Sequence, residues 1–87
     1  MLSLLDFYAN WCGPCIAMKP VIEKVEKDLE GKVTVERINV DENPQKAQEY
    51  NVMSIPTFVL VKDGEEVDRR IGAMNTEQFE SWIKSHL

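Results

Sequence analysis

The order of hydrophobic and polar residues predicts a strand at the start of the chain and a helix after it. Residues 2–9 are largely apolar, with Asp6 as the only charge, which is typical of a strand covered on both faces. Apolar side chains then recur every three or four residues across 18–29, so we expect an amphipathic helix that ends at Gly31. The β-branched residues of 33–40 predict a second strand.

A second, shorter helix is predicted from its end signals. Asn43 followed by Pro44 is a helix start, because asparagine can cap the first free amides and proline suits the first turn. We expect this helix to run to about Tyr50. Asn51 can then take the left-handed conformation in which the chain leaves a helix.

The last third of the chain is predicted to form a hairpin and a final helix. Residues 57–61 make an apolar strand, Asp63 and Gly64 supply a tight turn, and residues 67–71 belong to the returning strand. Asn75 is expected to cap the last helix. The buried stripe of that helix should consist of Phe79, Trp82 and Ile83.

These elements predict an α/β fold with the order strand, helix, strand, helix, strand, strand, helix. We expect a central mixed sheet of four strands, flanked by three helices that cover both faces. The two helical connections predict that the first three strands are parallel, and the hairpin adds an antiparallel edge. At 87 residues the chain is long enough for one domain, spanning residues 1–87.

The net charge of the chain argues against two classes of function, nucleic-acid binding and membrane binding. Fifteen Asp and Glu residues against ten Lys and Arg give a net charge of −5, which is the wrong sign for binding nucleic acid or an anionic membrane. The apolar start is too short to span a membrane and lacks the basic flank of a secretion signal. We therefore expect a soluble, cytoplasmic monomer with no nucleic-acid or membrane partner.

The only cysteines, Cys12 and Cys15, enclose Gly13 and Pro14 where the first strand turns into the first helix. Their spacing is about one helical turn, so the two thiols can meet. A helix N-terminus favours the thiolate, which makes Cys12 the better nucleophile. Cys15 lies further into the helix, so we expect it to be the more buried thiol. This resolving thiol would close the disulfide with Cys12 and expel a bound partner.

Three other interpretations of this pair stay open on the residues alone. A structural disulfide would close a short loop and stabilise the fold by roughly 2 kcal/mol. A metal site would need ligands from another molecule, since His86 is the only histidine and no further cysteine exists. The third interpretation is a pair of inert thiols. Redox exchange explains the spacing best, and we expect no metal and no cofactor beyond the disulfide itself.

Further motifs accompany the cysteine pair: Asp6 through Cys15, Pro20, Asn39 through Pro44, Ser54 through Thr57, Lys62 through Gly64, and Gly72 with Ala73. With these motifs the sequence resembles the thioredoxin family from Leu5 to about Leu87. Each matching motif is short, but their joint order and spacing are specific. The resemblance implies a thioredoxin fold and a protein-disulfide reductase in which Cys12 attacks and Cys15 resolves.

The resemblance also implies roles for the residues around the pair. Asp6 matches a buried carboxylate that exchanges protons with the inner thiol, and a lone acid in an apolar strand should have a raised pKa. Pro56 matches a cis-proline that faces the disulfide. On the residues alone, Asp6 could instead reach solvent and Pro56 could lie in a trans turn. The implied substrate-binding surface consists of Trp11, Gly13, Pro14, Ile55, Pro56 and Gly72.

Two departures from the family pattern change the expectations. The family normally has a further strand and helix before Leu5, so we expect a short form in which the strand at 33–40 is an exposed edge. Arg37 stands where the family usually has a lysine paired with the buried acid. Because a guanidinium keeps its charge, Arg37 should favour the ionised form of Asp6 where the two meet.

The expected partners are disulfide-containing proteins and an electron donor of the thioredoxin-reductase type. A glutaredoxin-like protein that draws electrons from glutathione is one alternative, although the Gly13-Pro14 pair favours thioredoxin. A redox-inert binding module or minimised scaffold with the thioredoxin shape is another. Against a scaffold, shape alone does not require the intact set of Cys12, Cys15, Asp6 and Pro56.

Overall fold

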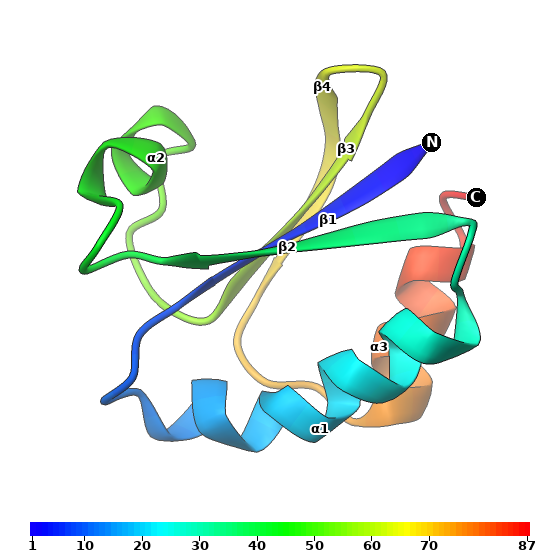
Figure 1. The fold of residues 1–87 in the computed structure, drawn as a ribbon, viewed down its shortest axis with the longest axis horizontal. Helices are drawn as coiled ribbons and strands as arrows, with labels where there is room; N and C mark the ends of the chain where they lie inside the picture. The colour runs from blue at the N-terminus through cyan, green and yellow to red at the C-terminus, as the bar shows by residue number, and fades with distance from the viewer.

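The computed structural model describes residues 1–87 and contains one four-stranded sheet with three helices packed on it (Figure 1). The elements follow the predicted order. None of the three helices combines the length and the apolar character that a membrane span requires. The elements are β1 (Leu2–Tyr8), α1 (Gly13–Asp28), β2 (Val33–Asn39), α2 (Pro44–Glu49), β3 (Thr57–Lys62), β4 (Glu65–Ile71) and α3 (Thr76–Lys84).

The sheet has the strand order β2-β1-β3-β4, which leaves β2 as the expected edge strand. β1 and β2 are parallel, whereas β3 is antiparallel to β1 and to β4. The sheet is therefore mixed as predicted, but the prediction that the first three strands are parallel is wrong.

The path of the connection between β2 and β3 accounts for this difference, because residues 40–56 do not cross the sheet although they are long enough to do so. A parallel β3 would need a connection that returns along the whole sheet, and the seven residues of β2 span roughly 23 Å. Instead, α2 lies beyond the end of β2, and the chain enters β3 at the same end of the sheet, since Thr57 pairs with Phe7 and Asn39 pairs with Tyr8 (Figure 1).

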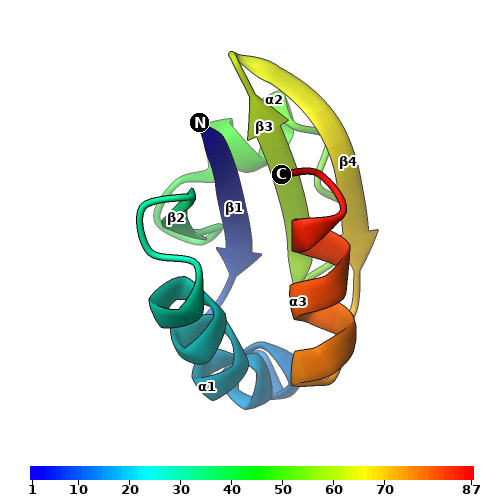
Figure 2. The same ribbon diagram turned by 90° about the vertical axis from the view of Figure 1, so that its right-hand side faces the viewer.

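Side chains form two hydrophobic layers, one on each face of the sheet. Figure 2 shows α1 and α3 side by side over one face, with α2 behind the sheet. The smaller layer, on the α2 face, contains Leu5, Phe7, Ile38 and Val59. The larger layer, under α1 and α3, contains Leu2, Leu4, Met18, Ile22, Val25, Leu29, Val33, Phe58, Leu60, Phe79, Trp82 and Ile83. β1 is thus buried on both faces, as its sequence predicts.

Most of the predicted turn and cap residues adopt the predicted conformations. Asn51 has a φ of 55°, and Asp63 and Gly64 in the β3–β4 turn have φ values of 52° and 84°. The Asn75 side chain caps α3 in a reciprocal capping box with Gln78. Short-range chemistry therefore fixes these element ends.

The start of α2 differs from its prediction. Pro44 opens the helix as expected, but the Asn43 side chain caps no helix amide. Its Nδ2 donates instead to the backbone carbonyl of Asn39, at 3.4 Å. The Asn39 side chain accepts the amides of Asp41 and Glu42, at 2.9 and 3.3 Å. The turn after β2 is thus organised around Asn39 rather than Asn43.

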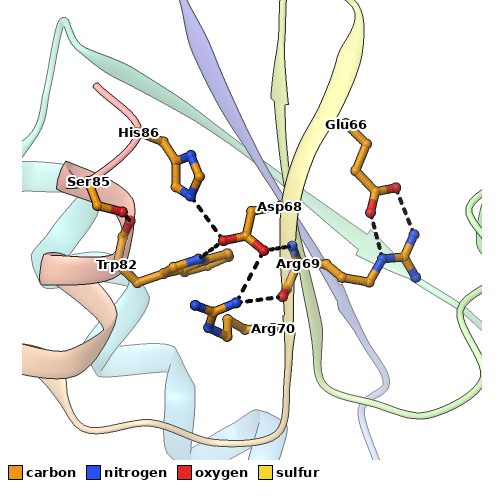
Figure 3. Close-up of polar contacts among 7 residues, drawn as sticks. All are labelled: Glu66, Asp68, Arg69, Arg70, Trp82, Ser85 and His86. Carbon is orange, nitrogen blue, oxygen red and sulfur yellow. Dashed lines mark hydrogen bonds and ion pairs between the residues drawn. The ribbon is translucent and has the colours of Figure 1, made fainter.

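Asp68 on β4 anchors the C-terminal end of α3 (Figure 3). Its Oδ2 accepts hydrogen bonds from Trp82 Nε1 at 2.8 Å and His86 Nε2 at 2.9 Å. Its Oδ1 accepts one from Arg70 Nη1 at 3.1 Å. These donors, Trp82 first, hold the pKa of Asp68 down at about 2.

Candidate active site

A disulfide joins Cys12 and Cys15 at the start of α1. Cys12 is the N-cap of this helix and has extended backbone angles, because the chain turns there from strand to helix. The Cys15 amide donates a hydrogen bond to Cys12 Sγ at 3.2 Å. After reduction, the same amide and the positive end of the helix can stabilise a thiolate on Cys12. The geometry therefore supports Cys12 as the nucleophile.

The two cysteines are about equally shielded from solvent. Cys12 exposes 5% of its surface and Cys15 exposes 7%. The prediction that Cys15 is the more buried cysteine is wrong for the disulfide form, because the bond holds both sulfurs in the same buried cluster. This cluster also contains Ala9, and Tyr8, Val40 and Ile55 pack against it. The preference for Cys12 thus rests on the helix N-terminus and not on exposure.

Asp6 lies in the middle of β1 and is only 2% exposed, so it does not reach solvent. It is directly opposite Arg37 in the β1–β2 pair, with 3.5 Å between Asp6 Oδ2 and Arg37 Nε. Burial raises the pKa of Asp6 to about 6, and the nearby guanidinium opposes this rise only in part. The acid therefore titrates close to neutral pH.

Asp6 and Cys15 face the same cavity of about 250 Å³. The buried Asp6 carboxyl therefore lies on the Cys15 side of the disulfide. Arg37 closes another part of the cavity wall. The complete lining is Asp6, Tyr8, Ala9, Asn10, Cys15, Ile16, Lys19 and Arg37.

The loop before β3 passes close to the disulfide. Its Ile55–Pro56 peptide bond is cis, as predicted, and Ile55 packs against the cluster that contains both cysteines. The Gly72 amide donates to the Pro56 carbonyl at 2.9 Å. Gly72 has a φ of 97°, and a Cβ added there would have no atom within 4 Å. The space beside the Gly72 Cα is therefore open.

Trp11 lies on the surface next to the cysteine pair. It is 71% exposed, and its Nε1 donates to Asp41 Oδ2 at 2.8 Å. Gly13 and Pro14 in the first turn of α1 are also exposed. The predicted substrate-binding residues thus lie on three segments: the turn that opens α1, the loop before β3, and the residue after β4. Of these residues, Pro56 is fully buried.

An apolar groove, which we call the α2 groove, adjoins this surface. Sequence reasoning identified Trp11 and Ile55 but did not assign Val52 or Met53 to the site, although these two apolar residues directly precede the Ser54–Thr57 motif. Met53 is 93% exposed, so its side chain is free for contact with another molecule. The α2 groove is lined by Trp11, Val40, Ala47, Val52, Met53, Ser54 and Ile55.

Comparison with known proteins gives consistent matches. The family model described as thioredoxin matches residues 1–85. The thioredoxin of Rickettsia conorii is 44% identical over 84 residues, which cover 97% of this chain and 80% of the relative. The thioredoxin of Staphylococcus saprophyticus is 44% identical over 86 residues, covering 99% and 83%. A solved mutant thioredoxin from Halobacterium salinarum superposes with a TM-score of 0.89 at 39% identity, covering 97% of this chain and 73% of that chain.

Proposed function

The chain belongs to the thioredoxin family and is a thiol–disulfide oxidoreductase, and we propose that Cys12, Cys15 and Asp6 carry its reduction of protein disulfides. The observation that supports these roles is the hydrogen bond from the Cys15 amide to Cys12 Sγ at the helix N-terminus. The buried acid on the opposite side of the pair supplies a second chemical group. Together they provide a nucleophile, a resolving thiol and a proton acceptor.

The first step is attack by the Cys12 thiolate on one sulfur of the substrate disulfide. The substrate S–S bond breaks as the bond to Cys12 forms, and the second substrate sulfur leaves as a thiolate that takes a proton from solvent. The product is a mixed disulfide between Cys12 and the substrate. The helix N-terminus promotes this step because it stabilises the negative sulfur before attack.

The second step needs the Cys15 thiol to lose its proton. With a pKa of about 6, the Asp6 carboxyl is mostly ionised at pH 7 and can accept that proton within the shared cavity. The Cys15 thiolate then attacks Cys12 Sγ, forms the intramolecular disulfide and expels the remaining substrate thiolate, which is protonated in turn. Two electrons have passed from the dithiol to the substrate.

The substrate chain docks on the surface around Cys12. Trp11 and Ile55 offer apolar contact, and the space beside the Gly72 Cα is open. The backbone groups of Met53 through Ile55 make no backbone hydrogen bond within the chain. The amide and carbonyl of Ile55 are therefore free to pair with an extended substrate segment, as in strand addition. Gly13 and Pro14 complete the surface over the first turn of α1.

The oxidised form must be reduced again by an electron donor. The family match favours a thioredoxin-reductase-type enzyme over glutathione, and disulfide-containing proteins as substrates. A dithiol that reduces other proteins works where thiols are kept reduced, which is the cytoplasm. The intact cysteine pair and the buried acid weigh against a redox-inert scaffold.

A reduction assay with insulin and three proteins tests the proposed roles. The wild type, supplied with a dithiol reductant, should precipitate the insulin B chain, and Cys12→Ser should not. Cys15→Ser should accumulate a mixed disulfide on Cys12, visible by intact-mass and peptide mapping. Activity in Cys12→Ser, or a trapped substrate on Cys15 in the wild type, would contradict the assignment.

A further inference from the structure

Arg69 on β4 links the strand to the loop that forms one wall of the α2 groove. Its Nε and Nη2 donate to the two carboxylate oxygens of Glu66, both at 2.7 Å. Nη2 also donates to the backbone carbonyl of Tyr50 at 2.8 Å. Tyr50 is the C-cap of α2 and lies 19 residues away in the sequence. The guanidinium therefore connects two segments that no other polar side chain joins.

A bulge in β4 makes this contact possible. Residues three apart on a regular strand point to opposite faces, so Glu66 and Arg69 would not normally meet. In the β3–β4 pair, however, Leu60 is opposite Asp68 and Val61 is opposite Glu66, so Val67 is an extra residue. The extra residue turns both side chains toward the α2 face. Figure 3 shows the Glu66–Arg69 pair on the opposite side of β4 from Asp68.

The Tyr50 carbonyl is where α2 ends and the groove loop begins. Carbonyls in the last turn of a helix have no partner within the helix and must find one elsewhere. The next residue, Asn51, has a φ of 55°, and Val52, Met53, Ser54 and Ile55 then line the groove.

Few bonds hold the loop after Tyr50. The Asn51 and Val52 amides donate to the Gln48 and Ala47 carbonyls, at 3.0 and 2.8 Å, and Thr57 Oγ1 donates to the Ser54 carbonyl at 2.6 Å. Residues 53–55 make no hydrogen bond between two backbone groups. The position of the groove wall therefore depends on how its two ends are fixed. At the first end Tyr50 and Val52 pack on the sheet, and Arg69 adds the side-chain hydrogen bond to the Tyr50 carbonyl.

We propose that Arg69, held in place by Glu66, is a positioning residue that fixes the Tyr50 carbonyl and thereby sets the α2 groove for a substrate polypeptide. This inference rests on the proposed function, because it assigns the groove to substrate docking. A local ion pair on an exposed strand contributes little by itself. The third hydrogen bond, to a distant carbonyl, is what gives the pair a role at the site.

The expected consequence is a loss of docking without a loss of chemistry. Arg69 touches neither cysteine, so the intrinsic reactivity of Cys12 should not depend on it. Arg69→Gln removes a charge-assisted hydrogen bond and frees the loop, so we expect KM for a protein disulfide to rise about three- to tenfold. The value of kcat should stay within about twofold, since the transition from mixed disulfide to product is unchanged.

Arg70 supplies a matched control on the other face of the same strand. It also pairs with a carboxylate, Asp68, at 3.1 Å, and its guanidinium lies over the Trp82 ring at 5.3 Å. Arg70→Gln removes the same charge but leaves the groove loop untouched. It should lower the melting temperature without changing KM. Met53→Gln, which alters the groove directly, serves as the positive control for a docking defect.

The test combines steady-state kinetics on insulin with the rate at which each reduced protein reacts with a small aromatic disulfide. Arg69→Gln should raise KM for insulin, match the wild type on the small disulfide, and show faster amide hydrogen exchange across residues 51–55. Glu66→Gln should raise KM by a smaller factor. If Arg69→Gln does not fold, Glu66→Gln is the variant that tests the proposal.

Two results would overturn the inference. One is an insulin KM for Arg69→Gln equal to that of Arg70→Gln, and the other is a parallel loss of reactivity toward the small disulfide. Failure of the proposed function looks different, because the wild type itself would then reduce neither substrate.

Discussion

Asp6 and Arg37 lie opposite each other with 3.5 Å between carboxylate oxygen and guanidinium nitrogen, yet the pKa of Asp6 is raised to about 6. The two groups differ in burial: the Asp6 side chain is 3% exposed and that of Arg37 is 33% exposed. Solvent screens the guanidinium while the carboxylate bears the full cost of desolvation. The expectation that Arg37 favours the ionised acid holds in direction, but burial has the larger effect.

Removing the guanidinium should raise the pKa of Asp6 further. Arg37 lowers this pKa by its charge and by hydrogen bonding, so Arg37→Gln should move the titration of Asp6 above pH 6. Arg37→Lys, which keeps a positive charge, should lie closer to the wild type. Carbon-13 NMR of the Asp6 carboxyl measures both shifts. An unchanged titration in Arg37→Gln would show that the two side chains do not interact in solution.

Asp6→Asn should stabilise the fold, and more so at high pH. Because the folded pKa is raised from 3.8 to about 6, the Asp6 contribution is most favourable below pH 3.8 and is lost as the pH rises through 6. Above that range the fold buries a charge that the unfolded chain exposes. Denaturant unfolding at pH 8 should show a gain of up to roughly 3 kcal/mol over the wild type. At pH 3.5 the two proteins should unfold at nearly the same denaturant concentration.

The same variant should resolve mixed disulfides slowly. Asparagine keeps the shape of Asp6 but cannot accept the Cys15 proton, so the resolving step should slow by roughly 100-fold. Rapid-mixing kinetics at pH 7 would separate this step from the attack by Cys12, which should be unchanged. Resolution at the wild-type rate would make Asp6 a bystander.

Local sequence signals predicted most of the fold because each acts over a few residues. The Asn75 cap, the Asp63-Gly64 turn and the left-handed Asn51 all depend on side chains within one turn. The direction of β3 does not: it depends on the end of the sheet at which the chain re-enters after α2, which is a tertiary property. A helix between two strands therefore does not by itself predict that the strands are parallel.

The site shows the same division between motif and tertiary structure. The motif residues, Cys12 and Cys15 above all, were predicted, but the equal burial of the two cysteines follows from the bond between them. Met53 has no motif of its own and joins the groove only because the loop folds beside Trp11. The link from Arg69 to Tyr50 requires a bulge at Val67 that no local signal marks.

Asp68→Asn should weaken the attachment of α3 to β4. The pKa of Asp68 is lowered to about 2 by its hydrogen bonds, so its contribution to stability is present above pH 3.8 and lost as the pH falls through 2. At pH 7 the variant should melt about 5 °C below the wild type. Between pH 4 and pH 2 its melting temperature should fall less steeply.

Asp63 provides the control for this prediction. It lies in the β3–β4 turn with a positive φ that asparagine also tolerates, and its side chain makes no hydrogen bond. Asp63→Asn should therefore leave the melting temperature at pH 7 close to that of the wild type. If Asp68→Asn behaves like Asp63→Asn, the hydrogen bonds to Trp82 and His86 do not anchor α3.

In the proposed mechanism Cys12 is the thiol that attacks, because it caps α1 and receives a hydrogen bond from the Cys15 amide on its sulfur. The most direct test is to reduce the protein fully and treat it at pH 7 with a limiting amount of iodoacetamide. The labelled cysteine is then identified by peptide mass mapping. We expect Cys12 to be labelled at least about tenfold faster than Cys15. Faster labelling of Cys15 would contradict the account and reverse the roles of the two thiols.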